Sequence, residues 1–349
     1  MTPSPHLADA SPVQRHALEC LEAGLNLSQK QASALFTEIV AGEVDDAVLE
    51  AVLVRLRDKG ETPEEIAGAA LAIRGAAMGR FDRPDYVFSD TCGTGGDGFG
   101  TVNISTAVAF VVAAAGVPVV KHGNRSVSSK CGSADVLEAL GAKLRADPTI
   151  SRRTLDEAGV CFLFAPQYHL GARHAMRVRK KLGTRTIFNV LGPLVNPARP
   201  DIQVMGVYDA ALTRPAATTL RLMGCKAALT VYGSGLDEVA LHGPTTISLL
   251  RESDIEDREL TPASFGVAAA PLHELAGGGP DENAAWMRTL LRGGGTATHN
   301  AAVAANAATV LWLAGKETDL ASATRLALGV LASGKPAQHL DAFVELTHA

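Results

Sequence analysis

Residues 90–106 read DTCGTGGDGFGTVNIST, and residues 121–133 read KHGNRSVSSKCGS. Each stretch lies between a short apolar run and a helix-like run, where a loop from a strand to a helix is expected. Glycines let backbone N–H groups approach an anion closely, and a helix N-terminus adds partial positive charge. Hydroxyl and ammonium groups supply further donors. Two such loops within the 55 residues 90–144 predict a site for one extended, multiply phosphorylated ligand.

The first loop matches, from Gly93 to Gly98, the G-x-G-x-x-G pattern of dinucleotide-binding folds. Two features argue against a dehydrogenase. The next helix is expected to begin near Asn103 or Ser105, too late to contain the third glycine, and the next strand ends in Lys121-His122 instead of an acid for the ribose. A Walker A loop is excluded because no Gly-Lys-Ser/Thr sequence closes the stretch. The neighbouring hydroxyl and amide donors disfavour an ordinary glycine turn.

The second loop lies between a predicted strand at 117–120 and a predicted helix at 134–140. Ser133 is the expected N-cap of that helix, and Asp135 lies in its first turn. The alternative is an exposed loop without a ligand. The concentration of cations and hydroxyls favours a phosphate-binding loop.

Asp237 and Glu238 follow a predicted strand at 227–232, so both carboxylates would lie at its carboxyl end. Mg²⁺ prefers oxygen ligands together with substrate phosphates and water. The pair is therefore a candidate magnesium site, and a solvated acidic turn is the alternative.

Residues 170–182 are predicted to form one strongly amphipathic helix. At about 100° per residue, its apolar face consists of Ala172, Ala175, Met176, Val178 and Leu182. Arg179 falls in the centre of that face. Its guanidinium could hold a substrate carboxylate through two hydrogen bonds, or it could extend past the apolar surface into solvent. His122 and His169 could orient ligand groups or simply pack.

The bulk properties restrict the class of protein. A chain of 349 residues favours two domains. Its net charge of −5 and its 5% aromatic content argue against a nucleic-acid partner. Five dispersed cysteines indicate reduced thiols in a cytosolic protein, and neither a secretory signal nor a membrane-spanning apolar run is found. We therefore expect a cytoplasmic protein without a membrane partner.

The chain is predicted to divide into three parts. Residues 1–10 are expected to be a flexible arm. Residues 11–82 are predicted to form a small all-helical domain, because capping boxes at Ser28 and Thr62 each precede helical apolar spacing. Residues 83–349 are predicted to form an α/β domain. In this part, β-like runs at 86–89, 117–120, 202–207 and 227–232 alternate with helical runs, which is typical of a mostly parallel central sheet.

At these residues the chain closely resembles the anthranilate phosphoribosyltransferases, which perform the second step of tryptophan synthesis from chorismate. The resemblance is carried by residues 90–106, 121–144, 162–169 and 178–198 and by the turn Gly235-Leu236-Asp237-Glu238. Weaker similarity covers nearly all of the chain beyond the arm. The resemblance implies a helical domain, joined by returning helices at about 170–195 and hinged to the α/β domain. It also implies a homodimer formed through the helices.

The resemblance further implies the roles of individual residues. Phosphoribosyl pyrophosphate would contact Gly93, Gly96, Asp97, Thr101, Asn103, Ile104, Ser105, Thr106, Lys121, His122, Gly123, Asn124, Arg125, Ser126, Val127, Ser128, Ser129 and Ser133. Anthranilate would contact Gly93, Asn124 and Arg179. Mg²⁺ would be held by Ser105, Asp237 and Glu238. The catalytic residues would be Lys121, Asp97 and His122.

The chain departs from the family pattern at two places. Leu170-Gly171 replaces the family's Pro-Ala and is expected to loosen the start of the helix that carries Arg179, and Cys131 replaces a serine.

Three other functions are alternatives to this one. The nearest is that of a pyrimidine nucleoside phosphorylase, which typically lacks an intact Lys121-His122-Gly123-Asn124 stretch. A binding protein with a degenerate site would have lost its glycines or the acidic pair, and a nucleic-acid-binding relative would need a basic groove.

Overall fold

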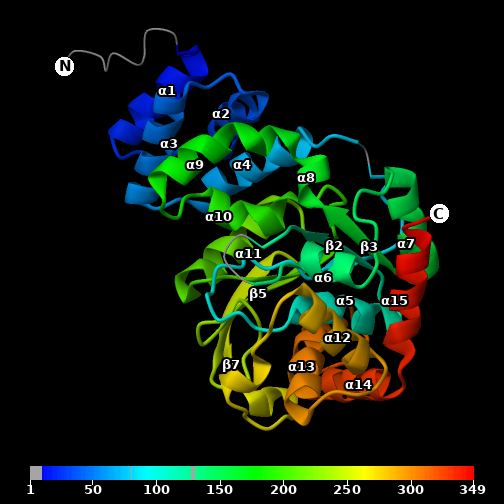
Figure 1. The fold of residues 1–349 in the computed structure, drawn as a ribbon. Helices are drawn as coiled ribbons and strands as arrows, with labels where there is room; N and C mark the ends of the chain where they lie inside the picture. Colours follow the sequence, from blue (N-terminus) through cyan, green and yellow to red (C-terminus); the bar gives the residue numbers. More distant parts are fainter. Residues whose placement is uncertain (1–9, 80, 127–129) are drawn as a thin grey trace.

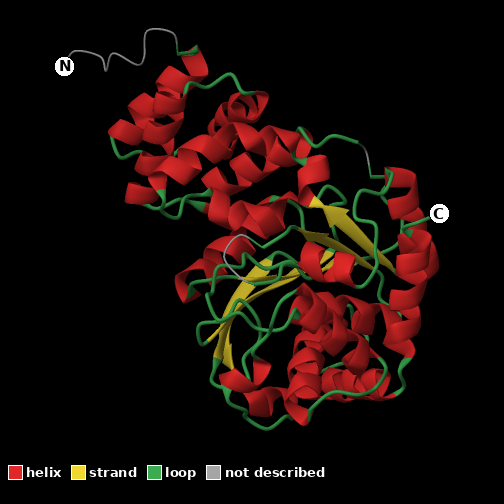
Figure 2. Cartoon of the chain, viewed as in Figure 1, coloured by secondary structure: helices red, strands yellow, loops and turns green. Residues whose placement is uncertain are grey.

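The chain folds into a bundle of helices placed against an α/β domain, as the computed structural model shows (Figures 1 and 2). The structure describes residues 10–79, 81–126 and 130–349. Three residues predicted to contact a phosphoribosyl ligand, Val127, Ser128 and Ser129, lie outside the described residues. None of the described helices is long and apolar enough to span a bilayer.

The N-terminal bundle consists of α1 (Pro12–Glu22), α2 (Gln29–Ala41), α3 (Asp46–Lys59) and α4 (Pro63–Gly75). The predicted capping boxes at the helix starts are confirmed. Ser28 and Thr62 each form a full capping box, and Gly42 ends α2 in the left-handed conformation that glycine adopts without strain.

A segment from the middle of the chain returns to this bundle. It comprises α8 (Ala165–Tyr168), a 3₁₀ helix (Leu170–Ala175), α9 (Met176–Leu182), α10 (Phe188–Leu191) and a second 3₁₀ helix (Gly192–Val195). In Figure 1, α9 lies among α3 and α4. Ala175, Val178 and Phe188 share a buried cluster with the apolar faces of the N-terminal helices.

The prediction of one continuous helix over 170–182 is wrong, because its first half is a 3₁₀ helix. This half passes so close to α2 that a Cβ on Gly171 would lie 2.4 Å from the carbonyl oxygen of Val40. The expected loosening at Leu170-Gly171 stays a prediction. Glycine permits a close backbone approach here that a larger residue would prevent.

The sheet contains seven strands in the order β3-β2-β1-β4-β5-β6-β7. The strands are β1 (Ser89–Asp90), β2 (Val119–Gly123), β3 (Val160–Phe164), β4 (Ile202–Gly206), β5 (Ala227–Gly233), β6 (Thr245–Arg251) and β7 (Asp254–Leu260). The first five pair in parallel, and β6 and β7 add an antiparallel hairpin. The predicted fold class, a helical domain on an α/β domain with a mostly parallel sheet, is confirmed.

Two strands differ from the prediction by more than one residue. β1 begins at Ser89 rather than at Tyr86, whose hydroxyl donates to Asp156 on α7 (Pro148–Ala158) and holds the preceding segment off the sheet. β2 runs on through Lys121, His122 and Gly123 because all three pair with β3. Lys121 and His122 are consequently buried, which their polar character did not indicate.

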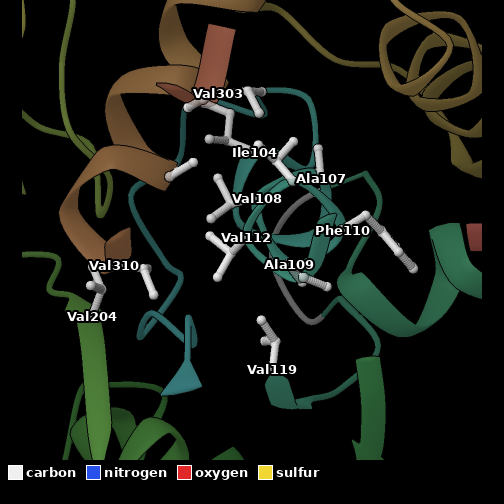
Figure 3. Close-up of a cluster of buried hydrophobic side chains, with 14 of the residues drawn as sticks. Ile104, Ala107, Val108, Ala109, Phe110, Val112, Val119, Val204, Val303 and Val310 are labelled. Carbon is white, nitrogen blue, oxygen red and sulfur yellow. The ribbon is translucent and has the colours of Figure 1, made fainter. Parts of the chain in front are cut away.

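Helices cover both faces of the sheet. Alternate residues of β4 point to opposite sides, as the pleat requires: Val204 joins the core beneath α5 (Ile104–Ala114), whereas Met205 joins the cluster shared with the helical bundle. Figure 3 shows Val108 and Val112 of α5 near Val310 and Val204. The remaining α-helices of the described residues are α6 (Ser133–Ala139), α11 (Thr213–Leu222), α12 (Pro280–Leu291), α13 (Ala297–Leu313), α14 (Leu320–Ala332) and α15 (Lys335–Leu346).

The strand order determines where a ligand can bind. From β1 the chain proceeds through α5 to β2 on one side, whereas β4 lies on the other side of β1. Loops at such a reversal separate and leave a crevice at the carboxyl ends of the strands. The first glycine-rich loop begins at this point, directly after β1.

Candidate active site

The first glycine-rich loop is held against β4 and β5 by its own backbone. The N–H of Thr94 donates to the carbonyl oxygen of Gly206, and the N–H of Gly95 donates to Asp237 Oδ2 at 2.6 Å. A Cβ on Gly93 would lie 2.5 Å from that same carboxylate oxygen, so glycine is needed for this approach. The loop therefore carries Gly96 and Asp97 over the ends of three strands.

Lys121 places a buried ammonium group at the start of this loop. Its Nζ donates to the carbonyl oxygen of Thr91 at 2.9 Å and to Ser105 Oγ at 3.2 Å, while only 3% of the residue is exposed. Its charge also opposes the effect of burial on Asp90, which raises the pKa of that carboxyl to about 6. A fixed cation thus lies where the glycine-rich loop leaves the sheet.

Asp237 and Glu238 meet Ser105 around a small hollow. The hollow has a volume of about 10 Å³ and is also lined by Gly93 and Gly206, which is about the size needed for one water molecule or ion. Glu238 Oε1 accepts from the N–H of Ser105 at 3.1 Å. A Cβ on Gly206 would lie 1.6 Å from the carbonyl oxygen of Asp237, so the close packing of β4 fixes the acidic turn.

The acidic pair is electrostatically suited to a cation. Both residues are half-buried, and this loss of solvation raises the pKa of Glu238 to about 8, with a further rise from the charge of Asp237. The pKa of Asp237 is raised to about 6 by the same loss of solvation and by nearby Asp97. Within the described residues, no three His, Cys, Asp or Glu side chains form a metal-binding group. The two carboxylates offer oxygen ligands of the kind that Mg²⁺ prefers, and Ser105, substrate phosphates and water would complete its oxygen shell.

The second loop is ordered by α6. Asp135 Oδ2 accepts from the N–H groups of Ser126 and Gly132, and Gly132 is the N-cap. The prediction of Ser133 as N-cap is therefore wrong, because the helix begins one residue earlier than expected: Asp135 accepts from the N–H of the N-cap Gly132, and the carbonyl oxygen of Asn124 accepts from the N–H of Ala134. Ser133 is the first helical residue, and its Oγ donates to the carbonyl oxygen of Asn124 at 3.3 Å.

Arg125 and Gly123 hold the second loop close to α6. Arg125 forms ion pairs with Glu138 and Asp135, and its guanidinium lies 5.7 Å from the ring centroid of Phe164. These contacts hold the side chain beside α6. A Cβ on Gly123 would lie 2.3 Å from Ser133 Oγ, so this glycine lets the end of β2 approach the helix.

Hydrogen bonds of the Asn103 side chain join the first loop to the second loop and to α12. Asn103 donates to the carbonyl oxygen of Cys131 at 3.1 Å, and its own oxygen accepts from Asn283 of α12 at 2.8 Å.

The other predicted contact residues of the first loop differ in burial. Thr101 is half-buried, whereas Ile104 is buried in the core and could offer a ligand only its backbone. Thr106 Oγ1 is buried and has no hydrogen-bond partner within the described residues.

Two buried imidazoles lie side by side behind the second loop. The rings of His122 and His169 are 5.2 Å apart in an edge-on arrangement, and His122 Nδ1 contacts the carbonyl oxygen of Gly192 at 3.0 Å. Burial lowers the pKa of His122 to about 3 and that of His169 to about 4. Both rings are therefore neutral near pH 7.

Arg179 stands apart from these groups, on α9 of the helical domain. Its guanidinium lies 5.0 Å from the ring centroid of Phe188, and in the described part of the chain it has no carboxylate partner. Only Ala175 and Val178 of the predicted apolar face are buried, while Met176 is 55% exposed. Arg179 is half-buried at the edge of this face rather than at its centre.

Sequence reasoning missed several residues of the site. Asn196 donates to Asp90 Oδ2 and to the carbonyl oxygen of Val120, and this ties β1 to β2. Arg185 stacks on Tyr208 at 3.8 Å and donates to the carbonyl oxygen of Gly96 at 2.9 Å. The glycine-rich loop is thereby linked to the returning segment. Only the position of Asp90 directly after an apolar run could have indicated its place at a strand end.

Family models match both parts of the chain. Residues 15–77 match the helical bundle domain of a glycosyl transferase family, and residues 85–337 match its α/β domain. An anthranilate phosphoribosyltransferase from Sorangium cellulosum is 57% identical over 95% of this chain and 94% of its own length. One from Aeromonas hydrophila is 54% identical over 95% of this chain and 97% of its own length. The chain therefore belongs to the anthranilate phosphoribosyltransferase family.

Solved structures agree with this assignment. An anthranilate phosphoribosyltransferase from Thermus thermophilus superposes with a TM-score of 0.90 at 41% identity, over 95% of this chain and 99% of that chain. The enzyme from Saccharomyces cerevisiae, in complex with PRPP and Mg, gives a TM-score of 0.87 at 26% identity, over 97% of this chain and 99% of that chain.

Proposed function

We propose that the protein transfers the 5-phosphoribosyl group of phosphoribosyl pyrophosphate to the amine of anthranilate. The products are N-(5-phosphoribosyl)anthranilate and pyrophosphate, in the biosynthesis of L-tryptophan. One observation carries the proposal: a glycine-rich loop, a buried ammonium group and an acidic pair meet at the strand reversal of a chain 57% identical to an enzyme of that name. The S. cerevisiae structure with PRPP and Mg supports the choice of donor and metal.

The sugar diphosphate is assigned to the two glycine-rich loops. The assigned residues are Gly93, Gly96, Asp97, Thr101, Asn103, Ile104, Ser105, Thr106, Lys121, His122, Gly123, Asn124, Arg125, Ser126 and Ser133. Backbone N–H groups would provide most of the donors, because several of these side chains are buried or already paired. Arg125, for example, would have to leave Glu138 to reach a phosphate.

Magnesium is assigned to Asp237 and Glu238, with Ser105 as a third oxygen ligand. When bound, Mg²⁺ would supply positive charge to the diphosphate oxygens. Lys121 would hold the Ser105 hydroxyl in place through the hydrogen bond between Nζ and Oγ.

Anthranilate is assigned to the space between the domains. Arg179 belongs to the helical domain, whereas Gly93 and Asn124 belong to the α/β domain. A guanidinium without a carboxylate partner is suited to the carboxylate of anthranilate. The domain limits that we propose are 11–82, joined by about 170–195, and the rest of 83–349.

The chemistry follows from these positions. The bond between the sugar carbon and the diphosphate oxygen breaks, and its electron pair leaves with pyrophosphate. The neutral amine of anthranilate attacks that carbon and then loses a proton to solvent, so no strong base is needed. Lys121 and the loop N–H groups would stabilise the charge that develops on the leaving group, and the two domains would position the reactants. Asp97 and His122 would position the sugar, and His122 would do so as a neutral imidazole.

We also propose a cytoplasmic homodimer formed through the helical domain. The large apolar side chains of Leu25 and Met176 are exposed there, at 57% and 55%. Burial of such side chains is a common feature of subunit interfaces. Light scattering coupled to size exclusion would give twice the chain mass for a dimer and 36.2 kDa for a monomer.

One assay separates the proposed reaction from its nearest rival. The protein is incubated with anthranilate, phosphoribosyl pyrophosphate and Mg²⁺ while anthranilate fluorescence is followed, and in parallel with uridine and phosphate. We expect fluorescence loss that requires all three components and no release of uracil. Uracil release without fluorescence loss would favour a pyrimidine nucleoside phosphorylase instead.

A further inference from the structure

A second cavity, lined mainly by basic residues, lies on the edge of the sheet opposite to the candidate active site. It has a volume of about 300 Å³, and its charged lining residues are Arg74, Arg83, Arg199, Asp201 and Lys226. Asp201 directly precedes β4, and Lys226 directly precedes β5. The cavity is therefore at the amino ends of these strands, about 13 Å along β4 from the glycine-rich loop, at about 3.3 Å per residue.

The charges in this cavity are only partly balanced. The buried carboxylate of Asp201 pairs with Arg83 at 2.7 Å and with Lys226 at 2.8 Å. In the part of the chain that the structure describes, the guanidinium groups of Arg74 and Arg199 have neither an ion pair nor a hydrogen bond. Burial and the neighbouring charge of Arg199 both lower the pKa of Arg74. The Asp201 carboxylate is already paired with Arg83 and Lys226, so an anion bound between Arg74 and the exposed Arg199 would relieve the repulsion between their charges.

Arg199 has an unusual backbone conformation. Arg199 adopts a φ of 56°, in the left-handed region that non-glycine residues rarely occupy. Its N–H donates to the carbonyl oxygen of Asn196, whose side chain belongs to the network that ties β1 to β2. A costly conformation held by a buried network is typical of a functional position.

We propose that this cavity is a second ligand site, which binds a small phosphomonoester with its phosphoryl group between Arg74 and Arg199. A phosphomonoester carries about −1.5 to −2 charges at pH 7, which matches the two unpaired guanidinium groups. A carboxylate would balance only one of them. A guanidinium group can bind a phosphate through two parallel hydrogen bonds to two of its oxygens. Leu220 and Met223 also line the cavity and would contact the organic part of the ligand.

The site would connect the two domains. Arg74 lies on α4 of the helical bundle, whereas Arg199 and Met223 belong to the α/β domain. A phosphoryl group held between them would favour one relative position of the domains. Any effect on ligands at the other edge of the sheet would be reciprocal, as for all coupled sites.

The test uses phenyl phosphate as the probe and isothermal titration calorimetry on the full chain. The double variant Arg74→Gln/Arg199→Gln should bind phenyl phosphate at least tenfold more weakly than the unmodified protein. Arg221→Gln is the matched control, because Arg221 is an exposed arginine of α11 that contacts Ser253 outside the cavity. This control and Lys121→Met, which alters the candidate active site, should both retain the affinity.

Three results would overturn the inference. The double variant could bind as tightly as the unmodified protein, or Lys121→Met alone could lose binding, which would place the probe in the active site and leave the proposed function intact. Benzoate could bind as tightly as phenyl phosphate, which would refute the phosphoryl assignment. If the double variant does not fold, the single variant Arg199→Gln, altered at an exposed side chain, should still weaken binding at least threefold.

Discussion

Replacing Lys121 with methionine removes one buried charge from the centre of the candidate active site while keeping most of the side-chain volume. The variant loses the hydrogen bonds from Nζ to the carbonyl oxygen of Thr91 at 2.9 Å and to Ser105 Oγ at 3.2 Å. An abandoned buried acceptor costs about 1 to 3 kcal/mol. We therefore expect the free energy of unfolding to fall by roughly that amount.

The catalytic effect should be larger than the effect on stability. Removing one donor that acts on developing charge costs about 2.7 to 4 kcal/mol, or roughly 100-fold to 1,000-fold in kcat. Burial raises the pKa of Glu238 and the charge of Lys121 opposes that rise, so the loss of Lys121 raises the pKa of this carboxyl further. The assay is the rate of anthranilate fluorescence loss at saturating substrates, with urea unfolding measured in parallel.

The matched control is Lys316→Met, which removes an exposed ammonium group just beyond α13. It should change neither kcat nor stability measurably. The reasoning would be refuted by a folded Lys121→Met protein whose kcat stays within threefold of the unmodified enzyme.

Four further predictions follow from the same geometry. Arg179→Lys should raise the KM for anthranilate at least tenfold, since a hydrogen bond to a charged group is worth about 1.5 to 3 kcal/mol and lysine cannot reproduce the bidentate contact; a change confined to the KM of the phosphoribosyl donor would contradict this role. Gly206→Ala should abolish activity and lower the unfolding free energy, because its Cβ would lie 1.6 Å from a backbone oxygen, whereas Gly329→Ala, with free space in α14, should be neutral or stabilising on urea unfolding. Chelation with EDTA should stop turnover and added Mg²⁺ should restore it, but Asp237→Asn should need a much higher Mg²⁺ concentration; equal Mg²⁺ titration curves would refute this ligand. His122, whose pKa is lowered to about 3, should show neutral-imidazole nitrogen shifts by NMR from pH 8 to pH 5, and its contribution to stability should be full above about pH 6.5 and decline as the pH falls toward 3; a titration near pH 6.5 would contradict its burial.

Helix boundaries were the most predictable part of the fold. The caps at Ser28 and Thr62 and the stop at Gly42 act within one turn of chain, so their signals are local in the sequence. The 3₁₀ helix before α9 was not predictable, because it depends on the approach of Gly171 to Val40, more than a hundred residues earlier.

The parts of the candidate active site that consist of residues adjacent in the sequence could be predicted. The glycine-rich loops and the pair Asp237-Glu238 are contiguous, and the strand reversal brings them together around one hollow. The supporting residues could not be predicted in this way. Asn196 and Asn283 each act on a backbone or side-chain group that is distant in sequence, and an isolated asparagine gives no indication of its partner.

A crystal structure of the protein soaked with phosphoribosyl pyrophosphate and Mg²⁺ tests the central claim most directly. The diphosphate is expected against the loop 93–106, with a metal ion about 2.1 Å from carboxylate oxygens of Asp237 and Glu238. A diphosphate bound only in the cavity of Arg74 and Arg199, with the loop and the acidic pair free of ligand, would contradict it.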